Sequence, residues 1–120
     1  MKPRKIYACW IYVSDLQRSK QFYQDIGFEI KLIDRDWIEF NFGETSFAIL
    51  QRPAHKGDVV ASKTRIMFEI DDIELIYEEL KNKGVKTIGE IRTEPYGKLL
   101  TFEDLDGHWL EFYQRLPFSD

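Results

Sequence analysis

The stretch that decides the fold is Val13-Ser14-Asp15-Leu16, which is followed by an amphipathic segment and by Gly27-Phe28. The same order returns as Ile70-Asp71-Asp72-Ile73, a second amphipathic segment and Gly84-Val85, at an offset of 57 residues. In each half an apolar strand precedes an acidic turn, a helix, a glycine and three further strand-like runs. A repeat of this size predicts two copies of one β-α-β-β-β motif, related by an internal pseudo-twofold axis.

The expected elements follow from hydrophobic period and turn residues. We expect one helix at about Leu16–Ile26, capped by Ser14 or Asp15, and a second at about Ile73–Lys83, capped by Asp71-Asp72. The strand-like runs are Ile6–Val13, Phe28–Ile33, Trp37–Phe42, Ser46–Gln51, Arg65–Ile70, Lys86–Ile91, Lys98–Glu103 and His108–Gln114.

These elements predict an α+β fold in which curved mixed sheets form a cup. Residues 1–120 should make one domain, with a first module at about 5–51, a linker at 52–64 and a second module at about 65–115. The chain is long enough to bury one sizeable core.

Composition limits the class of protein. The 120 residues are 43% hydrophobic and 15% aromatic, and 17 Lys+Arg against 21 Asp+Glu give a net charge of −4. Because the basic residues are scattered, nucleic acid is not an expected partner. No apolar run is long enough for a membrane span, and Met1–Lys5 leads into strand-like residues rather than a signal-peptide core. With a single Cys9, predicted to be buried, these features favour a cytoplasmic protein.

Alternation along the strands predicts which side chains face the cup. Uniformly apolar sets belong under the helices, and mixed sets belong opposite them. The inward positions include Ala8, Ile49, Gln51 and Glu69, and the candidate ligand-binding residues among them are Trp10, Tyr12, Phe47, Arg65, Met67, Trp109, Glu111 and Tyr113. Such a surface suits a planar or aromatic organic molecule held by stacking. The alternative is that these aromatic side chains fill the sheet interface as core.

A family resemblance rests on three strings. Val13–Phe28 with its Phe22-Tyr23 pair, Phe68–Asp72, and Asp104–Glu111 (Asp-Leu-Asp-Gly-His-Trp-Leu-Glu) resemble the vicinal oxygen chelate superfamily, which includes glyoxalase I, extradiol dioxygenases and bleomycin-resistance proteins. The resemblance covers nearly the whole chain and implies paired modules that form a cup. In the metalloenzymes of the family, a metal ion in that cup is held by His, Gln or Glu from the first and last strands of the modules.

Transferring these ligand positions to this chain predicts a protein without a metal or cofactor. The resemblance places them at Ala8, Ile49, Arg65 and Glu111, of which Glu111 alone has a metal-binding side chain. A guanidinium has no lone pair to give, and one carboxylate cannot hold a divalent ion. Of the two histidines, His108 is expected to be an exposed turn residue and His55 a solvated residue of the linker.

The predicted function is therefore small-molecule binding without catalysis, similar to that of the bleomycin-resistance branch. The alternative is a glyoxalase-like lyase or isomerase, or another metal-dependent member, that uses Glu111. A third interpretation is an interaction module with a vestigial cup. The resemblance also favours a symmetric homodimer with two equivalent cups.

Two further expectations concern charge. Arg65 and Glu111 should form an ion pair across neighbouring strands. A partly free Arg65 would favour a planar organic anion as ligand, whereas the net charge of −4 favours a cation.

Overall fold

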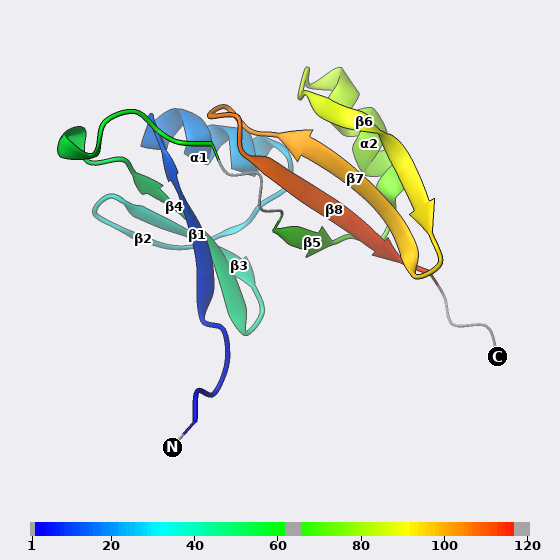
Figure 1. The fold of residues 1–120 in the computed structure, drawn as a ribbon, viewed down its shortest axis with the longest axis horizontal. Helices are drawn as coiled ribbons and strands as arrows, with labels where there is room; N and C mark the ends of the chain where they lie inside the picture. Colours follow the sequence, from blue (N-terminus) through cyan, green and yellow to red (C-terminus); the bar gives the residue numbers. More distant parts are fainter. Residues whose placement is uncertain (1, 62–65, 117–120) are drawn as a thin grey trace. The chain divides into compact units, whose positions relative to one another are not determined.

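The computed structural model describes residues 2–61 and 66–116 and divides into two compact units, Met1–Val60 and Ala61–Asp120 (Figure 1). The N-terminal unit contains β1 (Ala8–Val13), α1 (Leu16–Asp25), β2 (Ile30–Asp34), β3 (Trp37–Phe42), β4 (Thr45–Gln51) and a short 3-10 turn, Ala54–Lys56. The C-terminal unit contains β5 (Met67–Glu69), α2 (Ile73–Asn82), β6 (Thr87–Glu94), β7 (Gly97–Glu103) and β8 (Trp109–Arg115).

The two units share one topology. The strand order is β1-β4-β3-β2 in the first sheet and β5-β8-β7-β6 in the second, and in both the first strand runs parallel to the last while the other pairs are antiparallel. Each unit is thus a β-α-β-β-β module with a mixed sheet. The predicted α+β fold class and the internal repeat are confirmed.

Both helices begin with the same two hydrogen-bond acceptors. Asp15 Oδ1 accepts from Arg18 N and Asp72 Oδ1 from Leu75 N, each at 3.1 Å, as the capping prediction required. A glutamine on the last strand supplies the second acceptor. Gln51 Oε1 accepts from Leu16 N at 2.9 Å, and Gln114 Oε1 accepts from Ile73 N at 2.8 Å. The prediction that Gln51 faces the cup is therefore wrong, because its amide lies at the start of α1.

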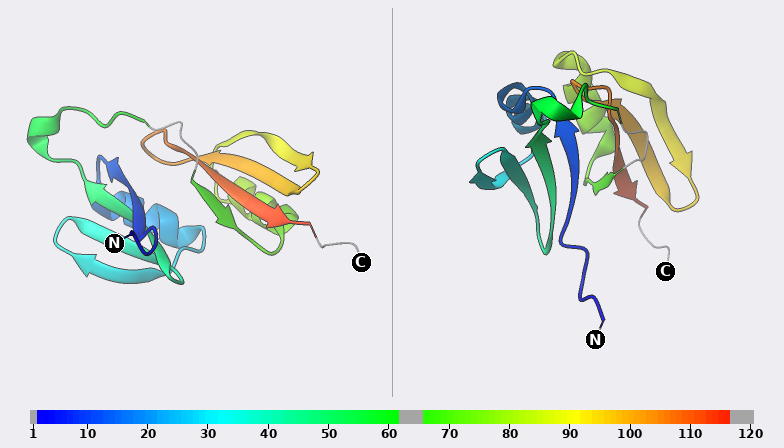
Figure 2. Two further views of the ribbon diagram at one scale, coloured as in Figure 1. Left: turned by 60° about the horizontal axis from the view of Figure 1, so that its bottom comes forward. Right: turned by 60° about the vertical axis from the view of Figure 1, so that its left-hand side comes forward.

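Each helix covers one face of its own sheet with an apolar layer (Figure 2). In the N-terminal unit, Tyr23 of α1 is fully buried, and its ring lies 5.1 to 5.7 Å from those of Phe28, Phe47 and Phe40. In the C-terminal unit the buried apolar residues are Phe68, Ile73, Ile76, Leu80, Leu99, Leu100, Phe102, Leu110 and Phe112. The opposite face of each sheet is left without a helix of its own unit.

The structure corrects the predicted face assignment of β4. Phe47 is 1% exposed and stacks on Phe40 beneath α1, and Ile49, two residues further on, shares that face. The opposite face carries the small Ser46 and Ala48. The prediction that Phe47 and Ile49 line the cup is wrong because the larger apolar side chains of β4 fill the helix-facing core.

Two single-residue predictions also fail. Cys9 is exposed rather than buried, because it lies on β1 at an edge of the sheet. His108 is 3% exposed, whereas an exposed side chain was predicted. Its backbone N–H donates to Asp104 Oδ1 at 2.9 Å and so closes the turn between β7 and β8.

The helices are short. Within the described part of the chain, no helix combines the length and the apolar character that crossing a membrane requires.

Candidate functional site

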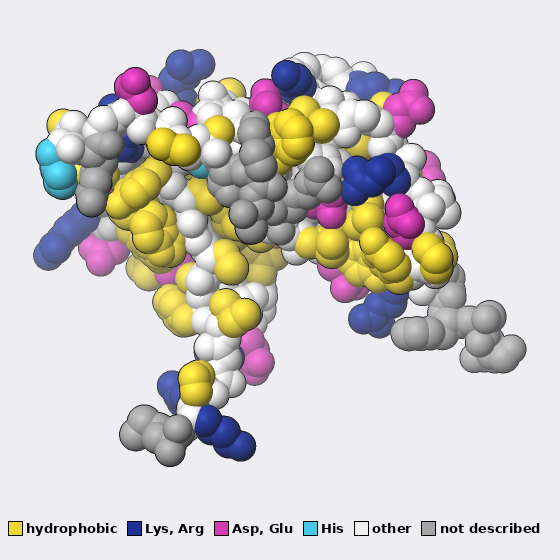
Figure 3. All heavy atoms as spheres, viewed as in Figure 1, with side chains coloured by type: hydrophobic (Ala, Val, Ile, Leu, Met, Phe, Trp, Pro, Cys, Tyr) yellow, Lys and Arg dark blue, Asp and Glu magenta, His cyan; other side chains and the backbone are white. Residues whose placement is uncertain are grey.

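Three aromatic side chains gather on the face of the N-terminal sheet opposite α1. The ring centroid of Trp10 lies 5.0 Å from that of Tyr12 and 6.3 Å from that of Trp37. Trp10 is 46% exposed. We call Trp10, Tyr12 and Trp37 the aromatic cluster. Figure 3 shows hydrophobic side chains at the surface over the strands of this unit.

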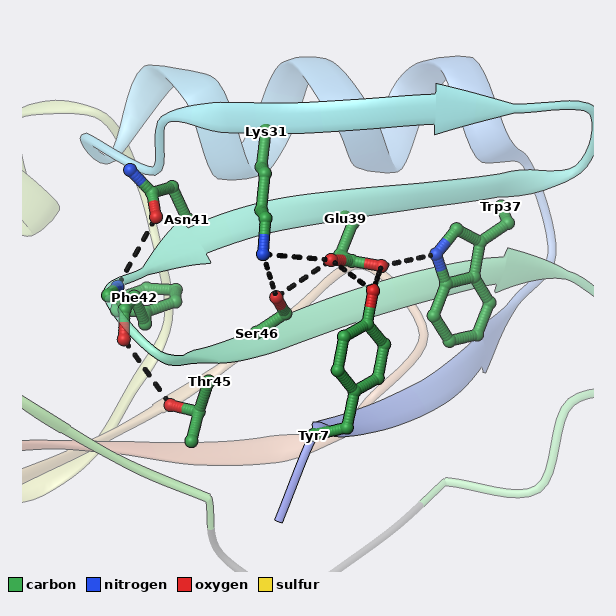
Figure 4. Close-up of polar contacts among 9 residues, drawn as sticks. Tyr7, Lys31, Trp37, Glu39, Asn41, Phe42, Thr45 and Ser46 are labelled. Carbon is green, nitrogen blue, oxygen red and sulfur yellow. Dashed lines mark hydrogen bonds and ion pairs between the residues drawn. The ribbon is translucent and has the colours of Figure 1, made fainter. Parts of the chain in front are cut away.

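A buried carboxylate lies beside this cluster. Glu39 of β3 is 1% exposed and accepts hydrogen bonds from Trp37 Nε1 at 2.9 Å, from Ser46 Oγ at 2.8 Å and from the Tyr7 hydroxyl at 3.2 Å. The ammonium of Lys31 approaches it at 3.6 Å. The four partners come from β2, β3, β4 and the segment before β1 (Figure 4). Glu39 thus joins three strands of the sheet and the segment that precedes β1.

These contacts set the ionisation of Glu39. Burial alone raises the pKa of its carboxyl group, because it penalises the charged form. The hydrogen bonds from Trp37, Ser46 and Tyr7, together with the charge of Lys31, outweigh burial and hold the pKa below its ordinary value of 4.5. Glu39 is therefore a carboxylate at neutral pH.

The C-terminal sheet carries a second buried carboxylate on its corresponding face. Glu111 Oε2 accepts from Arg92 Nη2 at 2.8 Å and from Thr101 Oγ1 at 3.0 Å, and Arg92 Nη1 donates to Thr101 at 3.2 Å. Arg65, the predicted partner of Glu111, lies outside the described residues. Arg92 of β6, which was not predicted, is the ion-pair partner that the structure describes.

The remaining predicted site residues of this unit have different surroundings. Met67 of β5 lies beside Glu111 of β8 and is exposed, so it contributes apolar surface to the helix-free face of this sheet. The Trp109 indole donates to Glu103 Oε1 at 3.1 Å. The Tyr113 hydroxyl donates to the carbonyl of Tyr96 at 3.1 Å, and its ring lies over Gly97. Tyr113 therefore supports the β6–β7 turn.

The side chains at the family's metal positions do not fit a divalent ion. Strand register pairs Trp10 with Ala48 and Met67 with Glu111, so Ala48, not Ile49, corresponds to Glu111. The methyl groups of Ala8 and Ala48 offer no lone pair, and Glu111 already accepts from Arg92 and Thr101. Across residues 2–61 and 66–116, no three His, Cys, Asp or Glu side chains are grouped to hold a metal.

Sequence reasoning missed four important side chains: Trp37, Glu39, Lys31 and Arg92. Trp37 and Glu39 could have been found, because the alternation along Trp37–Phe42 separates Trp37, Glu39 and Asn41 from three apolar residues. Arg92 could not, because the register of β6 shifts between Ile88 and Arg92, near Gly89 with its φ of +78°. Such an irregularity breaks the period-two pattern.

The fold and the two faces define a class of protein built from paired β-α-β-β-β modules, with one side of each sheet under a helix and the other carrying aromatic and charged side chains. Residues 5–112 match the Glyoxalase/Bleomycin resistance protein/Dioxygenase superfamily, and the chain belongs to this superfamily.

Several known proteins are similar to this chain in sequence or in fold. The uncharacterized Bacillus subtilis (strain 168) protein YetH is 33% identical over 113 residues, which cover 88% of this chain and 93% of YetH. Two solved structures share the fold. TnmS3, an antibiotic binding protein from Streptomyces sp. CB03234, has a TM-score of 0.77 at 21% identity and covers 97% of this chain and 99% of its own. The oxidase ChaP-H2 has a TM-score of 0.78 at 22% identity, with 98% of each chain covered.

Proposed function

We propose that this protein binds a planar or aromatic organic molecule without catalysis and without a metal ion, as in the bleomycin-resistance branch of the superfamily. The observation that carries the proposal is the aromatic cluster, in which Trp10 is 46% exposed while it contacts Tyr12 and Trp37. Aromatic side chains that are fixed by neighbouring rings and still expose a ring surface to solvent can bind flat molecules by stacking. The antibiotic-binding function of TnmS3, which has the same fold, supports this proposal.

The buried carboxylates support binding over catalysis. A general base works best when its pKa lies near the operating pH, and the pKa of Glu39 is shifted away from that range. Glu111, the candidate base of the enzyme alternative, is held by Arg92 at 2.8 Å. Both groups are therefore arranged to anchor neighbouring side chains.

A binding assay with a matched pair of variants tests the proposal. Naphthylmethanol, a neutral planar probe, should bind the full chain saturably in a calorimetric titration. Trp10→Ala should weaken this binding at least fivefold, whereas Leu75→Ala, which truncates an exposed apolar residue on α2, should not. Unchanged binding in Trp10→Ala would overturn the proposed site.

Metal titration tests the enzyme alternative. Calorimetry with Ni²⁺, Zn²⁺, Mn²⁺ or Fe²⁺ should show no stoichiometric tight binding, because Ala8 and Ala48 provide no donor atoms. One metal ion bound per chain with sub-micromolar affinity, and lost in Glu111→Ala, would instead favour a glyoxalase-like lyase or isomerase.

We further propose that the protein acts as a cytoplasmic homodimer, with cups assembled from paired sheet faces. The exposed Trp10, Leu32 and Met67 support this, because apolar side chains on helix-free sheet faces favour association. Light scattering at micromolar concentration should return twice the chain mass of 14.3 kDa. A mass of one chain under these conditions would contradict the dimer.

A further inference from the structure

The side chain of Lys31 occupies a cation site on the N-terminal sheet. Its Nζ lies 3.6 Å from Glu39 Oε2, 3.4 Å from Ser46 Oγ and 5.8 Å from the centroid of the Tyr7 ring. A carboxylate, a hydroxyl and an aromatic face together form a site that suits an ammonium group. Figure 4 shows Lys31 and Tyr7 reaching Glu39 from opposite sides.

Lys31 is a loosely held occupant. Its contacts are long for charge-assisted hydrogen bonds, and 39% of its side chain is exposed. By contrast, Arg92 reaches Glu111 at 2.8 Å and also binds Thr101. The two side chains are exposed to a similar extent, 39% and 37%, so the longer contacts of Lys31 are what make it easier to displace than Arg92.

Withdrawal of Lys31 would leave a negative charge that favours another cation. Glu39 would keep its three neutral donors, but a buried carboxylate without a counter-ion is unfavourable. Trp37 places this charge directly beside the aromatic cluster, because its indole N–H bonds to Glu39 and its ring lies 6.3 Å from that of Trp10.

We propose that the N-terminal sheet face binds a planar aromatic ammonium ion, whose ring stacks on the aromatic cluster and whose ammonium group replaces Lys31 beside Glu39. This inference rests on the proposed function and names the charge class of its ligand. It replaces the expectation of an anion, which depended on Arg65. The net charge of −4 also attracts cations to the protein.

Three probes that share the naphthalene ring system and differ in charge test the inference. Naphthylmethylammonium, naphthylmethanol and naphthoate are titrated calorimetrically into the full chain at low salt. The ammonium probe should bind at least tenfold more tightly than naphthoate, with naphthylmethanol between them. This preference should decrease as salt is added, because salt screens the charge of Glu39.

Two variants locate the charge. Lys31→Met should strengthen binding of the ammonium probe about threefold or more, because it removes the competing occupant. Lys98→Met is the matched control, since it breaks the exposed 2.7 Å pair with Glu74 on the other unit and changes the net charge equally. Glu39→Gln should reduce the ratio of ammonium to neutral-probe affinity to below about two.

The outcomes separate this inference from the proposed function. Binding of all three probes with equal affinity would overturn the cation site and leave the aromatic site intact. Failure of every probe to bind would overturn both. An equal effect of Lys31→Met and Lys98→Met would assign the preference to net charge and overturn the site at Glu39.

Discussion

The helix-free faces of the two sheets place a buried carboxylate at matching points but take it from different strands. In the N-terminal sheet, Glu39 of β3 lies opposite Ala48 of β4. In the C-terminal sheet, Thr101 of β7 lies opposite Glu111 of β8. The carboxylate thus belongs to the same cross-strand pair in both sheets, but it comes from the third strand of one module and from the last strand of the other. The repeat therefore specifies a position on the sheet and leaves open which strand fills it.

The partners of the two carboxylates differ more than their positions. Arg92 and Thr101 each donate a short hydrogen bond to Glu111, and a further hydrogen bond joins Arg92 to Thr101. Glu39 has three neutral donors and a lysine at 3.6 Å. The C-terminal face has a fixed charge pair, and the N-terminal face has a replaceable cation beside aromatic rings.

The largest expected effect comes from substitution of Gly97 in the C-terminal unit. The Tyr113 ring occupies the space that a side chain at this position would need. A Cβ atom there would contact the backbone oxygen of Gln114 and lie 2.6 Å from Tyr113 Cε1. Gly97→Ala should lower the free energy of unfolding by about 3 kcal/mol in chemical denaturation, because the backbone of β8 must move.

Gly43→Ala provides the comparison from the N-terminal unit. Gly43 has a φ of +70° but open space around its Cβ position, so the substitution should cost about 1 kcal/mol from backbone strain alone. Equal losses for the two variants would show that Tyr113 does not close over this turn.

The second prediction compares the two cations. Arg92→Met should lower the free energy of unfolding by about 2 kcal/mol, because it leaves Glu111 buried without its ion-pair partner and part of the guanidinium was already in solvent. Lys31→Met should lower it by less, about 1 kcal/mol, because three neutral donors still bind Glu39. Denaturant titrations that gave similar losses would remove the distinction between a fixed and a replaceable cation.

The smallest expected effect is a pH dependence. Because the pKa of Glu39 is lower in the folded chain, its ionisation stabilises the fold above its ordinary pKa of 4.5, and this contribution disappears as the pH falls through the folded value. Glu39→Gln should be less stable than the wild type at pH 7 and should lose less stability between pH 5 and pH 3. Thermal unfolding across this range, with Glu79→Gln as a control on α2, measures the difference.

The fold could be predicted from the sequence because the repeat, the capping aspartates and the glycine stops all indicate the same module. The site could be predicted in part. Trp10, Tyr12, Trp109 and Glu111 alternate with apolar residues on regular strands, so the sequence indicates which side chains share a sheet face, while their role in binding stays a prediction. Phe47 was misassigned because β4 is apolar on both faces, so its pattern does not distinguish them.

The charge partners could not be predicted at all from local patterns. Lys31 and Arg92 both lie where the strand register shifts, in β2 between Ile30 and Leu32 and in β6 between Ile88 and Arg92. At such points the direction of a side chain depends on the three-dimensional path of the backbone.

The glutamine caps make each half of the chain complete in its secondary structure. Gln51 joins β4 to the start of α1 and Gln114 joins β8 to the start of α2, and every described strand pairing lies within one unit. A protease cut between Val60 and Ala61 would therefore break none of the described strand pairings and neither of these helix caps. Expression of the two halves as separate polypeptides would show whether each unit folds without the other.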